Sequence, residues 1–208
     1  MYARSTTIQA KPSALDAGIA HMRDKVMPAL EDISGCIGMS LLVDRASGRC
    51  IATTSWESEE AMRKSADQVH PLRDRAVQLF GADSARVEQW EVGAMHRDHR
   101  IREGACAQVT WAKADDLGRF DAAVETYKSM VASQLEQMPG FCSTSLLIDR
   151  ATGRGVACET FDSSDAIKRN RKQLEALRRE DTRQTGVNVL EVGDFEIALA
   201  HLRVPELV

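Results

Sequence analysis

Four residues carry side chains suited to binding and oxidising an aromatic molecule: His70, Trp90, Trp111 and Tyr127. Because imidazole titrates near neutral pH, His70 could remove a proton from a phenol and leave an electron-rich anion that reacts with oxygen. The rings of tryptophan and tyrosine offer flat, largely apolar surfaces to such a molecule. We therefore predict that His70 is a catalytic base and that Trp90, Trp111 and Tyr127 bind the ligand.

Each of these residues also has a purely structural interpretation. His70 precedes Pro71 on an expected helix, where it could simply face solvent, and Pro71 predicts a kink in that helix. The aromatic residues could instead fill the hydrophobic core, as large apolar side chains usually do. The sequence leaves both interpretations open.

Motifs for metals, phosphates and nucleophiles are weak. His96 and His99 are three residues apart in the charged stretch HRDHRIREG, which lacks a third acidic or thiol ligand in a zinc-binding pattern. Glycine-rich phosphate loops and nucleophile signatures are also missing from the sequence. We therefore predict no metal and no cofactor.

Cysteine usage and charge narrow the class of protein. The five cysteines form no CxxC pair, which indicates reduced thiols and a cytoplasmic protein. The net charge of −4 and the scattered basic residues argue against a nucleic-acid partner. No apolar run approaches the roughly 20 residues of a membrane span, so no membrane partner is expected.

An internal repeat dominates the sequence. SLLVDRASGR (residues 40–49) recurs as SLLIDRATGR (residues 145–154), 105 positions later. The match runs without gaps from Gly35 and Gly140 to Ala61 and Ala166, and it resumes in WEVG and LEVG near the end of each copy. Two copies indicate a duplicated domain, since solenoids need three or more units. We predict repeats at residues 1–98 and 99–208.

Each copy reads as strand, helix, strand, strand, helix, strand. The two middle strands are joined by a turn in which Asp44 or Asp149 bonds its own backbone, and Gly48 or Gly153 supplies a positive φ. Arginines beside these turns could instead grip a ligand. The element order is that of a ferredoxin-like α+β fold, an antiparallel sheet with helices on one face. Apolar residues on both phases of the strands predict that the second sheet face also packs.

The chain resembles the dimeric α/β-barrel superfamily, and within it the antibiotic-biosynthesis-monooxygenase-like domains. The resemblance rests on PGF (residues 139–141), on SWESEEAM (residues 55–62) with its echo TFDSSDAI (residues 160–167), and on the closing WEVG and LEVG strands. In that family two ferredoxin-like subunits pair their sheets into a barrel. The resemblance therefore implies an α+β pseudo-dimeric barrel within one chain.

The same resemblance implies a function. It predicts an oxidoreductase that binds a small apolar or aromatic molecule and acts as a cofactor-independent monooxygenase on an aromatic or polycyclic substrate. Haem degradation is disfavoured, because the asparagine, tryptophan and histidine of the haem-degrading relatives have no counterparts at the matching positions. A non-catalytic binding or assembly module is the alternative, and the chain could be a monomeric pseudo-dimer or a homodimer of pseudo-dimers.

Differences between the copies can distinguish a catalytic role of these residues from a purely structural one. Where His70 stands in the first copy, Glu175 stands in the second. If the halves diverged for catalysis, such polar differences should cluster in one pocket. Scatter over the surface would favour the structural interpretation.

Overall fold

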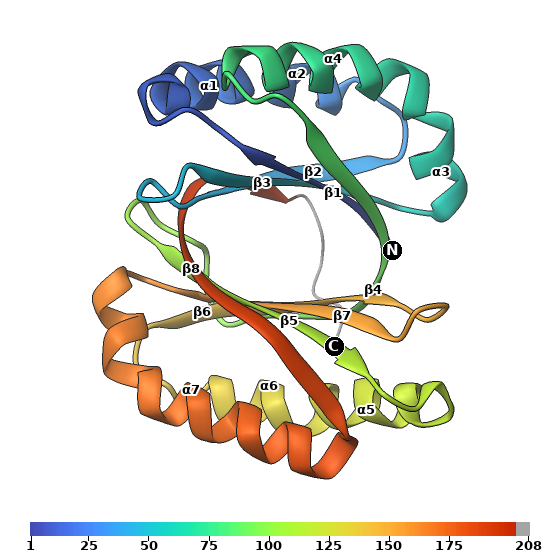
Figure 1. Cartoon of the computed structure of the whole chain (residues 1–208), viewed down its shortest axis with the longest axis vertical. Helices are drawn as coiled ribbons and strands as arrows, with labels where there is room; N and C mark the ends of the chain where they lie inside the picture. Colours follow the sequence, from blue (N-terminus) through green and yellow to red (C-terminus); the bar gives the residue numbers. More distant parts are fainter. Residues whose placement is uncertain (203–208) are drawn as a thin grey trace. The chain divides into compact units, whose positions relative to one another are not determined.

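Each half of the chain builds a sheet with helices on one of its faces (Figure 1). The computed structural model describes residues 1–202, apart from the side chains of residues 130–132 and 202. The last six residues of the predicted second repeat, 203–208, lie outside the described residues. The sheets are antiparallel throughout the described strand pairs, as the sequence predicts.

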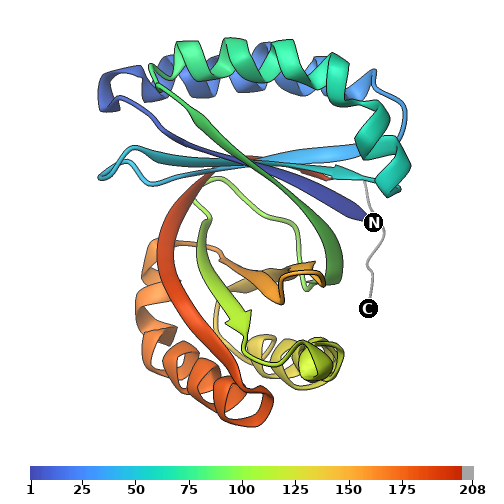
Figure 2. The same cartoon turned by 45° about the vertical axis from the view of Figure 1, so that its right-hand side comes forward.

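The first half follows the predicted element order. Its elements are β1 (Tyr2–Gln9), η1 (Pro12–Ala14), α1 (Leu15–His21), η2 (Met22–Val26), α2 (Met27–Glu31), β2 (Cys36–Val43), β3 (Arg49–Trp56), α3 (Glu59–Lys64), α4 (Ala66–Leu79) and β4 (Ala85–Arg97). Both views in Figures 1 and 2 show α1, α2 and α4 together over one face of the sheet.

The second half repeats this order. Its elements are β5 (Cys106–Ala114), η3 (Leu117–Arg119), α5 (Phe120–Thr126), η4 (Tyr127–Val131), α6 (Ala132–Leu135), β6 (Phe141–Asp149), β7 (Arg154–Phe161), α7 (Ser164–Thr185) and β8 (Val187–Leu202). In Figure 1, α5, α6 and α7 cover one face of the sheet of this half.

The strand order confirms the predicted fold class. By backbone hydrogen bonding it runs β4-β1-β3-β2 in the first half and β8-β5-β7-β6 in the second, which is the ferredoxin-like order twice. The hydrogen-bonded order of the eight strands is that of a closed antiparallel barrel, β1-β3-β2-β8-β5-β7-β6-β4. The fold is thus a tandem α+β pseudo-dimer.

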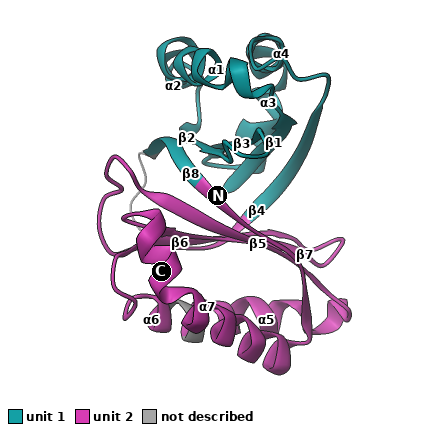
Figure 3. Ribbon diagram, turned by 60° about the vertical axis from the view of Figure 1, so that its left-hand side comes forward, with its two compact units in different colours: residues 1–91, 196–204 teal, residues 92–195, 205–208 magenta. Residues whose placement is uncertain are grey.

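Two long strands contribute to both compact units of the chain. Unit 1 consists of Met1–Glu91 and the part of β8 from Glu196 onward, and unit 2 consists of Val92–Phe195 (Figure 3). The end of β4 therefore belongs to unit 2, and the end of β8 pairs with β2 in unit 1. Because the units exchange strand ends, their limits differ from the predicted repeat limits of 1–98 and 99–208, which stay a prediction about the duplicated sequence.

The repeated phrase forms a hairpin turn in each copy, as predicted. The carboxylate of Asp44 accepts the backbone N–H of Ala46 at 2.9 Å, and Asp149 accepts that of Ala151 at 3.0 Å. Gly48 has a φ of 80°, and a Cβ there would lie 2.4 Å from the carbonyl oxygen of Ala10. The turn chemistry thus explains the repeat without a ligand.

The arginines beside the turns are structural as well. Arg45 bonds the carboxylates of Asp16 and Glu196, and Arg150 bonds Asp121. Their partners lie on neighbouring elements of the same unit.

The second helical segment of unit 1 breaks at Ser65 and runs on through Pro71, where the sequence predicts a kink. The carbonyl of Met62 explains the position of the break, because it accepts hydrogen bonds from Arg4 at 2.5 Å and from the Ser65 hydroxyl at 2.7 Å. Gln108 takes the place of Arg4 in unit 2, and there α7 is continuous.

Both copies also carry a π-helical segment at the same place in their first helix, η2 and η4. Such segments are rare and occur frequently at functional sites, because the extra residue redirects the side chains around it. Tyr127 begins η4 and Met22 begins η2. In the described residues no helix is long and apolar enough to cross a membrane.

Candidate functional site

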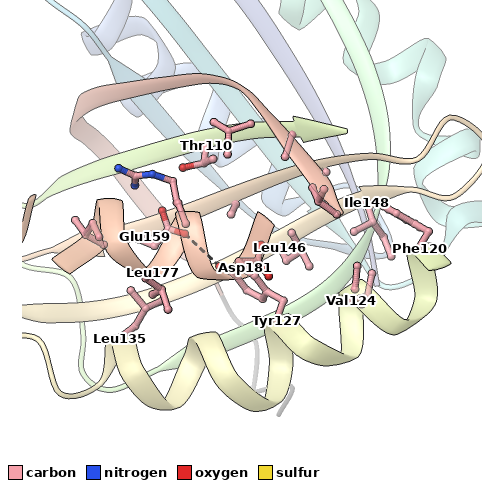
Figure 4. A pocket seen from close by; sticks show the side chains of 18 residues that line it. Thr110, Phe120, Val124, Tyr127, Leu135, Leu146, Ile148, Glu159, Leu177 and Asp181 are labelled. Atoms are coloured by element: carbon pink, nitrogen blue, oxygen red, sulfur yellow. Dashed lines mark hydrogen bonds between the residues drawn. The ribbon is translucent and has the colours of Figure 1, made fainter. Parts of the chain in front are cut away.

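A pocket opens in unit 2 between the sheet and its helices (Figure 4). The cavity has a volume of about 80 Å³. Its walls are mostly apolar, with a few polar groups, as is typical of small-molecule sites. The lining side chains include Phe120, Val124, Leu135, Leu146, Ile148 and Leu177.

Every second residue of strand β7 contributes to the floor of the pocket. Gly155, Ala157 and Glu159 all line it, because every second residue of a strand points to the same face. Glycine and alanine leave space there, whereas larger side chains would fill it. Helix α7 supplies Arg178 and Asp181 from the opposite wall.

The centre of the site is the carboxyl group of Glu159. It is buried, and its Oε1 accepts a hydrogen bond from the hydroxyl of Tyr127 at 3.3 Å. That hydroxyl also lies 2.6 Å from the Thr144 hydroxyl. Burial raises the pKa of Glu159 to about 7, although Arg178 and Tyr127 oppose the rise. A carboxyl with this pKa can both accept and return a proton near neutral pH.

Burial also raises the pKa of Tyr127 well above its usual value, and the charge of Glu159 adds to the rise. Tyr127 therefore stays neutral and acts as a hydrogen-bond donor. Figure 4 shows Tyr127 reaching from its helix toward Glu159 on the sheet.

Arg178 is held by a polar chain that runs across the sheet. It donates to the Gln108 side chain, which donates to Asp194 at 2.7 Å. Asp194 in turn accepts a hydrogen bond from Arg171 at 2.8 Å. The guanidinium is thereby fixed where its positive charge acts on Glu159.

Three buried polar atoms around the pocket lack a hydrogen-bond partner among the described residues. They are Oε2 of Glu159, Oδ1 of Asp181 and Oγ1 of Thr110. An unpaired buried polar group costs about 1–3 kcal/mol, so native proteins rarely keep several together. All three residues line the same cavity, where a ligand with hydroxyl or amino groups could satisfy them.

Unit 1 has a pocket at the equivalent place, but it is smaller. Its cavity volume is about 30 Å³. Met22 replaces Tyr127, Thr54 replaces Glu159, and Ala76 replaces Asp181. The ring of Phe80 lines this pocket and is 1% exposed. Two polar differences between the copies, Glu159 opposite Thr54 and Asp181 opposite Ala76, thus lie in the pocket of unit 2.

The structure brings only one of the four sequence-predicted residues to this pocket. Tyr127 lines it. Trp111 lies on β5 between two lining residues, so its ring points to the other face of the sheet, where it contacts Phe195 edge-on at 6.2 Å between ring centroids. Trp90 is buried in unit 1 and donates from Nε1 to the Ser5 hydroxyl at 2.8 Å.

His70 lies on the surface of α4 in unit 1. Its side chain is 62% exposed and its Nε2 is 3.1 Å from Oδ2 of Asp74, while Nδ1 faces Arg73. Glu175, its counterpart, is exposed too. Neither residue lines a described pocket, because both are on the solvent side of their helices. The catalytic role of His70 and the ligand contacts of both tryptophans stay predictions.

The sequence analysis did not identify three of the pocket residues, Glu159, Asp181 and Arg178. Glu159 lies inside the aligned repeat, opposite Thr54, so a position-by-position search for new carboxylates in one copy would have found it. Asp181 lies opposite Ala76 in the same way. Their burial depends on packing between α7 and the sheet, which residue spacing alone does not show.

We expect Asp181→Asn to stabilise the protein above pH 6. Burial raises the pKa of Asp181 to about 6, from 3.8 in an unfolded chain. The folded state thus holds the proton more tightly, and stability falls as pH rises from about 4 through 6. The variant should gain about 1 kcal/mol at pH 8, after allowance for solvent screening, and nothing near pH 4. Denaturant unfolding at both pH values measures this.

Glu175→Gln is the matched control, because it removes an exposed carboxylate from the same helix. A gain of equal size in both variants, or a gain that persists at pH 4, would show that the burial of Asp181 is not its cause.

Comparison with known proteins places these features in context. The family model described as "Antibiotic biosynthesis monooxygenase" matches residues 1–70. A protein of Mycobacterium tuberculosis strain H37Rv named "Uncharacterized protein Rv2557" is 57% identical over 208 residues, which cover 100% of this chain and 92% of that protein.

Solved structures show the same fold at low identity. A Lactobacillus acidophilus protein described as a "putative monooxygenase" superposes with a TM-score of 0.70 at 10% identity, covering 97% of this chain and 96% of that one. A protein described as anthrone oxidase-like superposes with a TM-score of 0.66 at 14% identity, covering 99% and 94%. These likenesses support the fold alone.

Proposed function

Because this chain belongs to the antibiotic-biosynthesis-monooxygenase-like family of dimeric α/β barrels, with both halves of the barrel in one chain, we propose that the pocket of unit 2 binds a small aromatic molecule and oxidises it with molecular oxygen. Glu159 is the general base of this reaction. The enzyme is a cofactor-independent monooxygenase, as the sequence analysis predicts, and the lack of CxxC pairs among its five cysteines suits a cytoplasmic location.

One observation carries the proposal. Three residues that line one apolar cavity of unit 2 each carry a buried polar atom without a hydrogen-bond partner among the described residues, and unit 1 has threonine and alanine in place of two of them. Random divergence would scatter such changes over the surface. A ligand whose hydroxyl groups bond these atoms would remove the cost of burying them.

The enclosed space fits one end of the ligand. It is smaller than the roughly 150 Å³ cavity that holds benzene in another protein. We therefore expect a phenolic ring to enter edge first, with further rings in the open mouth. Phe120 and Leu146 would contact its faces, and Thr110 and Asp181 would accept hydrogen bonds from its hydroxyl groups.

The chemistry begins with a proton transfer. Glu159 removes a proton from a carbon or oxygen atom that is conjugated with the aromatic system, and the positive charge of Arg178 favours the ionised base. The resulting anion passes an electron to oxygen, and the two radicals combine to a peroxide on the substrate carbon. Protonated Glu159 returns its proton to the outer peroxide oxygen.

The second half of the reaction completes the balance. The O–O bond breaks as the remaining proton leaves the same carbon, which forms a C=O bond and water. One oxygen atom enters the product and the other leaves as water, so a CH₂ group and O₂ give C=O and H₂O. The substrate itself supplies all the electrons.

The proposal is tested by oxygen uptake and product analysis. A panel of naphthols, hydroquinones and anthrone-like compounds is incubated with the full chain under isotopically labelled oxygen. We expect uptake with at least one compound and one labelled oxygen atom in its product. Ligand binding without any uptake across the panel would instead favour the binding module, and light scattering would show whether pseudo-dimers associate.

Tyr127→Phe should move the pH profile of this reaction to higher pH. The hydrogen bond from Tyr127 lowers the pKa of Glu159, so its loss raises that pKa above about 7. More alkaline conditions are then needed to ionise the base. The midpoint of the rise of kcat/KM with pH should therefore lie at a higher pH than in the native enzyme.

Tyr2→Phe is the matched control, since the chain has only two tyrosines and Tyr2 lies in unit 1. An unchanged pH profile in Tyr127→Phe would contradict the assignment of Glu159 as the base.

A further inference from the structure

Three side chains that can bind a metal ion meet in unit 2 outside the pocket. The imidazole of His99, the thiol of Cys142 and the carboxylate of Asp162 place their ligand atoms within 4.8 Å of one another. They come from three segments: the loop after β4, the start of β6 and the residue after β7. None of them lines the pocket, so this cluster is independent of the proposed function.

The spacing of the ligand atoms is close to that of a tetrahedral zinc site. Nε2 of His99 lies 3.0 Å from Oδ1 of Asp162, and Sγ of Cys142 lies 3.5 Å from the same oxygen. Zinc bonds of about 2.0–2.3 Å place neighbouring ligand atoms roughly 3.3–3.8 Å apart. Both separations from Oδ1 of Asp162 are therefore within a few tenths of an ångström of this range, and the ligand atoms of His99 and Cys142 lie within 4.8 Å of each other.

A fourth residue orients the imidazole. Asp98 contacts Nδ1 of His99 at 2.7 Å, which leaves Nε2 to face Cys142 and Asp162. Metal-binding histidines almost always have a carboxylate or carbonyl on the other ring nitrogen in this way. The backbone N–H groups of Asp98 and His99 also donate to the carbonyl of Cys142, at 2.9 and 3.3 Å. The loop is thus fixed against β6 before any ion binds.

We infer that unit 2 binds one zinc ion through Nε2 of His99, Sγ of Cys142 and Oδ1 of Asp162. A thiolate, an imidazole and a carboxylate together select zinc over magnesium or calcium, which prefer oxygen ligands alone. The thiol proton is released on binding, and a water molecule takes the fourth position. The site belongs to the second copy only, because Ile37 and Glu57 occupy the places of Cys142 and Asp162 in the first.

The surroundings of the three side chains allow an ion to enter, but they also include a positive charge that weakens its binding. The Cys142 side chain is fully buried, whereas those of His99 and Asp162 are 33% and 45% exposed, so an ion can reach the cluster from solvent. The positive charge of Arg102 acts on Cys142 and Asp162 and opposes a cation there. Arg102 is exposed, which allows its side chain to turn away.

Cobalt titration of the chelator-treated full chain tests the inference, because cobalt replaces zinc in such sites and reports its ligands by absorption. We expect one equivalent per chain, a thiolate-to-cobalt charge-transfer band, and displacement of the cobalt by zinc. Cys142→Ser should abolish the band. Asp162→Asn, which keeps the shape of an exposed side chain, should weaken binding by at least about 10- to 100-fold.

Two controls separate the site from adventitious binding. Cys158→Ser removes another thiol of the same sheet, and His96→Ala removes the neighbouring imidazole, which stacks on Phe141. Both should bind cobalt as the native chain does. A band that survives Cys142→Ser, or is lost equally in Cys158→Ser, would overturn the inference, as would the absence of any charge-transfer band.

Changes outside the three ligands give a second readout. Asp98→Asn should weaken zinc binding by about 10- to 100-fold, because it loosens the orientation of His99. Arg102→Ala should strengthen binding, because it removes the opposing charge. Equal affinity in both variants and the native chain would mean that the ion binds elsewhere. Circular dichroism of each variant confirms that the fold is retained.

Discussion

Replacement of Glu159 by glutamine is expected to lower kcat/KM by about 10²- to 10⁴-fold, the usual contribution of a positioned general base. Glutamine keeps the size of the side chain and can still accept the hydrogen bond from Tyr127. It cannot take a proton, so the effect falls on turnover, whereas KM changes little. Steady-state oxygen uptake with any substrate found in the panel measures both constants.

The same substitution should make the protein more stable at neutral and alkaline pH. Burial raises the pKa of Glu159 to about 7, against 4.5 in the unfolded chain, so the folded state binds the proton more tightly. Stability therefore falls as pH rises from about 4.5 through 7, and the full penalty applies above that range. Glu159→Gln should gain on the order of 2–3 kcal/mol at pH 8 and little at pH 4.5.

Two comparisons make this result specific. Glu125→Gln removes a carboxylate with a side chain that is 69% exposed on α5, and it should change neither turnover nor stability appreciably. His70→Ala tests the base predicted from sequence in the same assay. If Glu159 is the base, His70→Ala keeps activity within about twofold, as surface changes usually do. A large loss in His70→Ala with normal turnover in Glu159→Gln would reverse the assignment.

Gly155→Leu is expected to weaken ligand binding by about 10- to 100-fold, because an isobutyl group would occupy the space that the ring needs and overpacking costs about 1–3 kcal/mol. Gly155 lines the pocket from β7, and its backbone φ is not positive. A Cβ at this position has its nearest neighbours at 3.8 Å, in Leu146 and Leu147, so the chain accepts a side chain there without strain.

A graded series gives this experiment its own control. Gly155→Ala adds only the Cβ and should leave affinity nearly unchanged, while its stability rises by about 0.5–1 kcal/mol because glycine is unfavourable in a strand. Gly155→Cys copies unit 1, which has Cys50 at the equivalent position, and should fall between the two. Calorimetric titration ranks the affinities. Equal affinity across alanine, cysteine and leucine would place the ligand outside this pocket.

Features governed by neighbouring residues could be predicted from the sequence. Asp44 and Gly48 define their turn through contacts within five residues, and the second copy repeats them. The same holds for Ser58 and Ser163, each of which accepts the backbone N–H three residues on and so caps a helix. The repeat then predicts the fold, because each copy has the element order strand, helix, strand, strand, helix, strand, which is that of a ferredoxin-like unit.

Features that depend on distant contacts could not be predicted in the same way. The helix breaks at Ser65 because Arg4, sixty-one residues earlier, bonds the same turn. Glu159 reads as an ordinary polar residue in an alternating strand until α7 covers it. Even His99 looks like half of a failed motif with His96, since its neighbours Cys142 and Asp162 lie 43 and 63 residues away in the sequence.

The unequal cavities of the two units have a consequence for stoichiometry. Two identical subunits would carry every change twice, so each buried carboxyl would destabilise both sites, and two ligands would bind per barrel. In the duplicated chain, Glu159 and Asp181 occur on one side only, opposite Thr54 and Ala76. Ligand titrations should therefore follow a single-site isotherm with one equivalent per chain and a Hill coefficient of about 1.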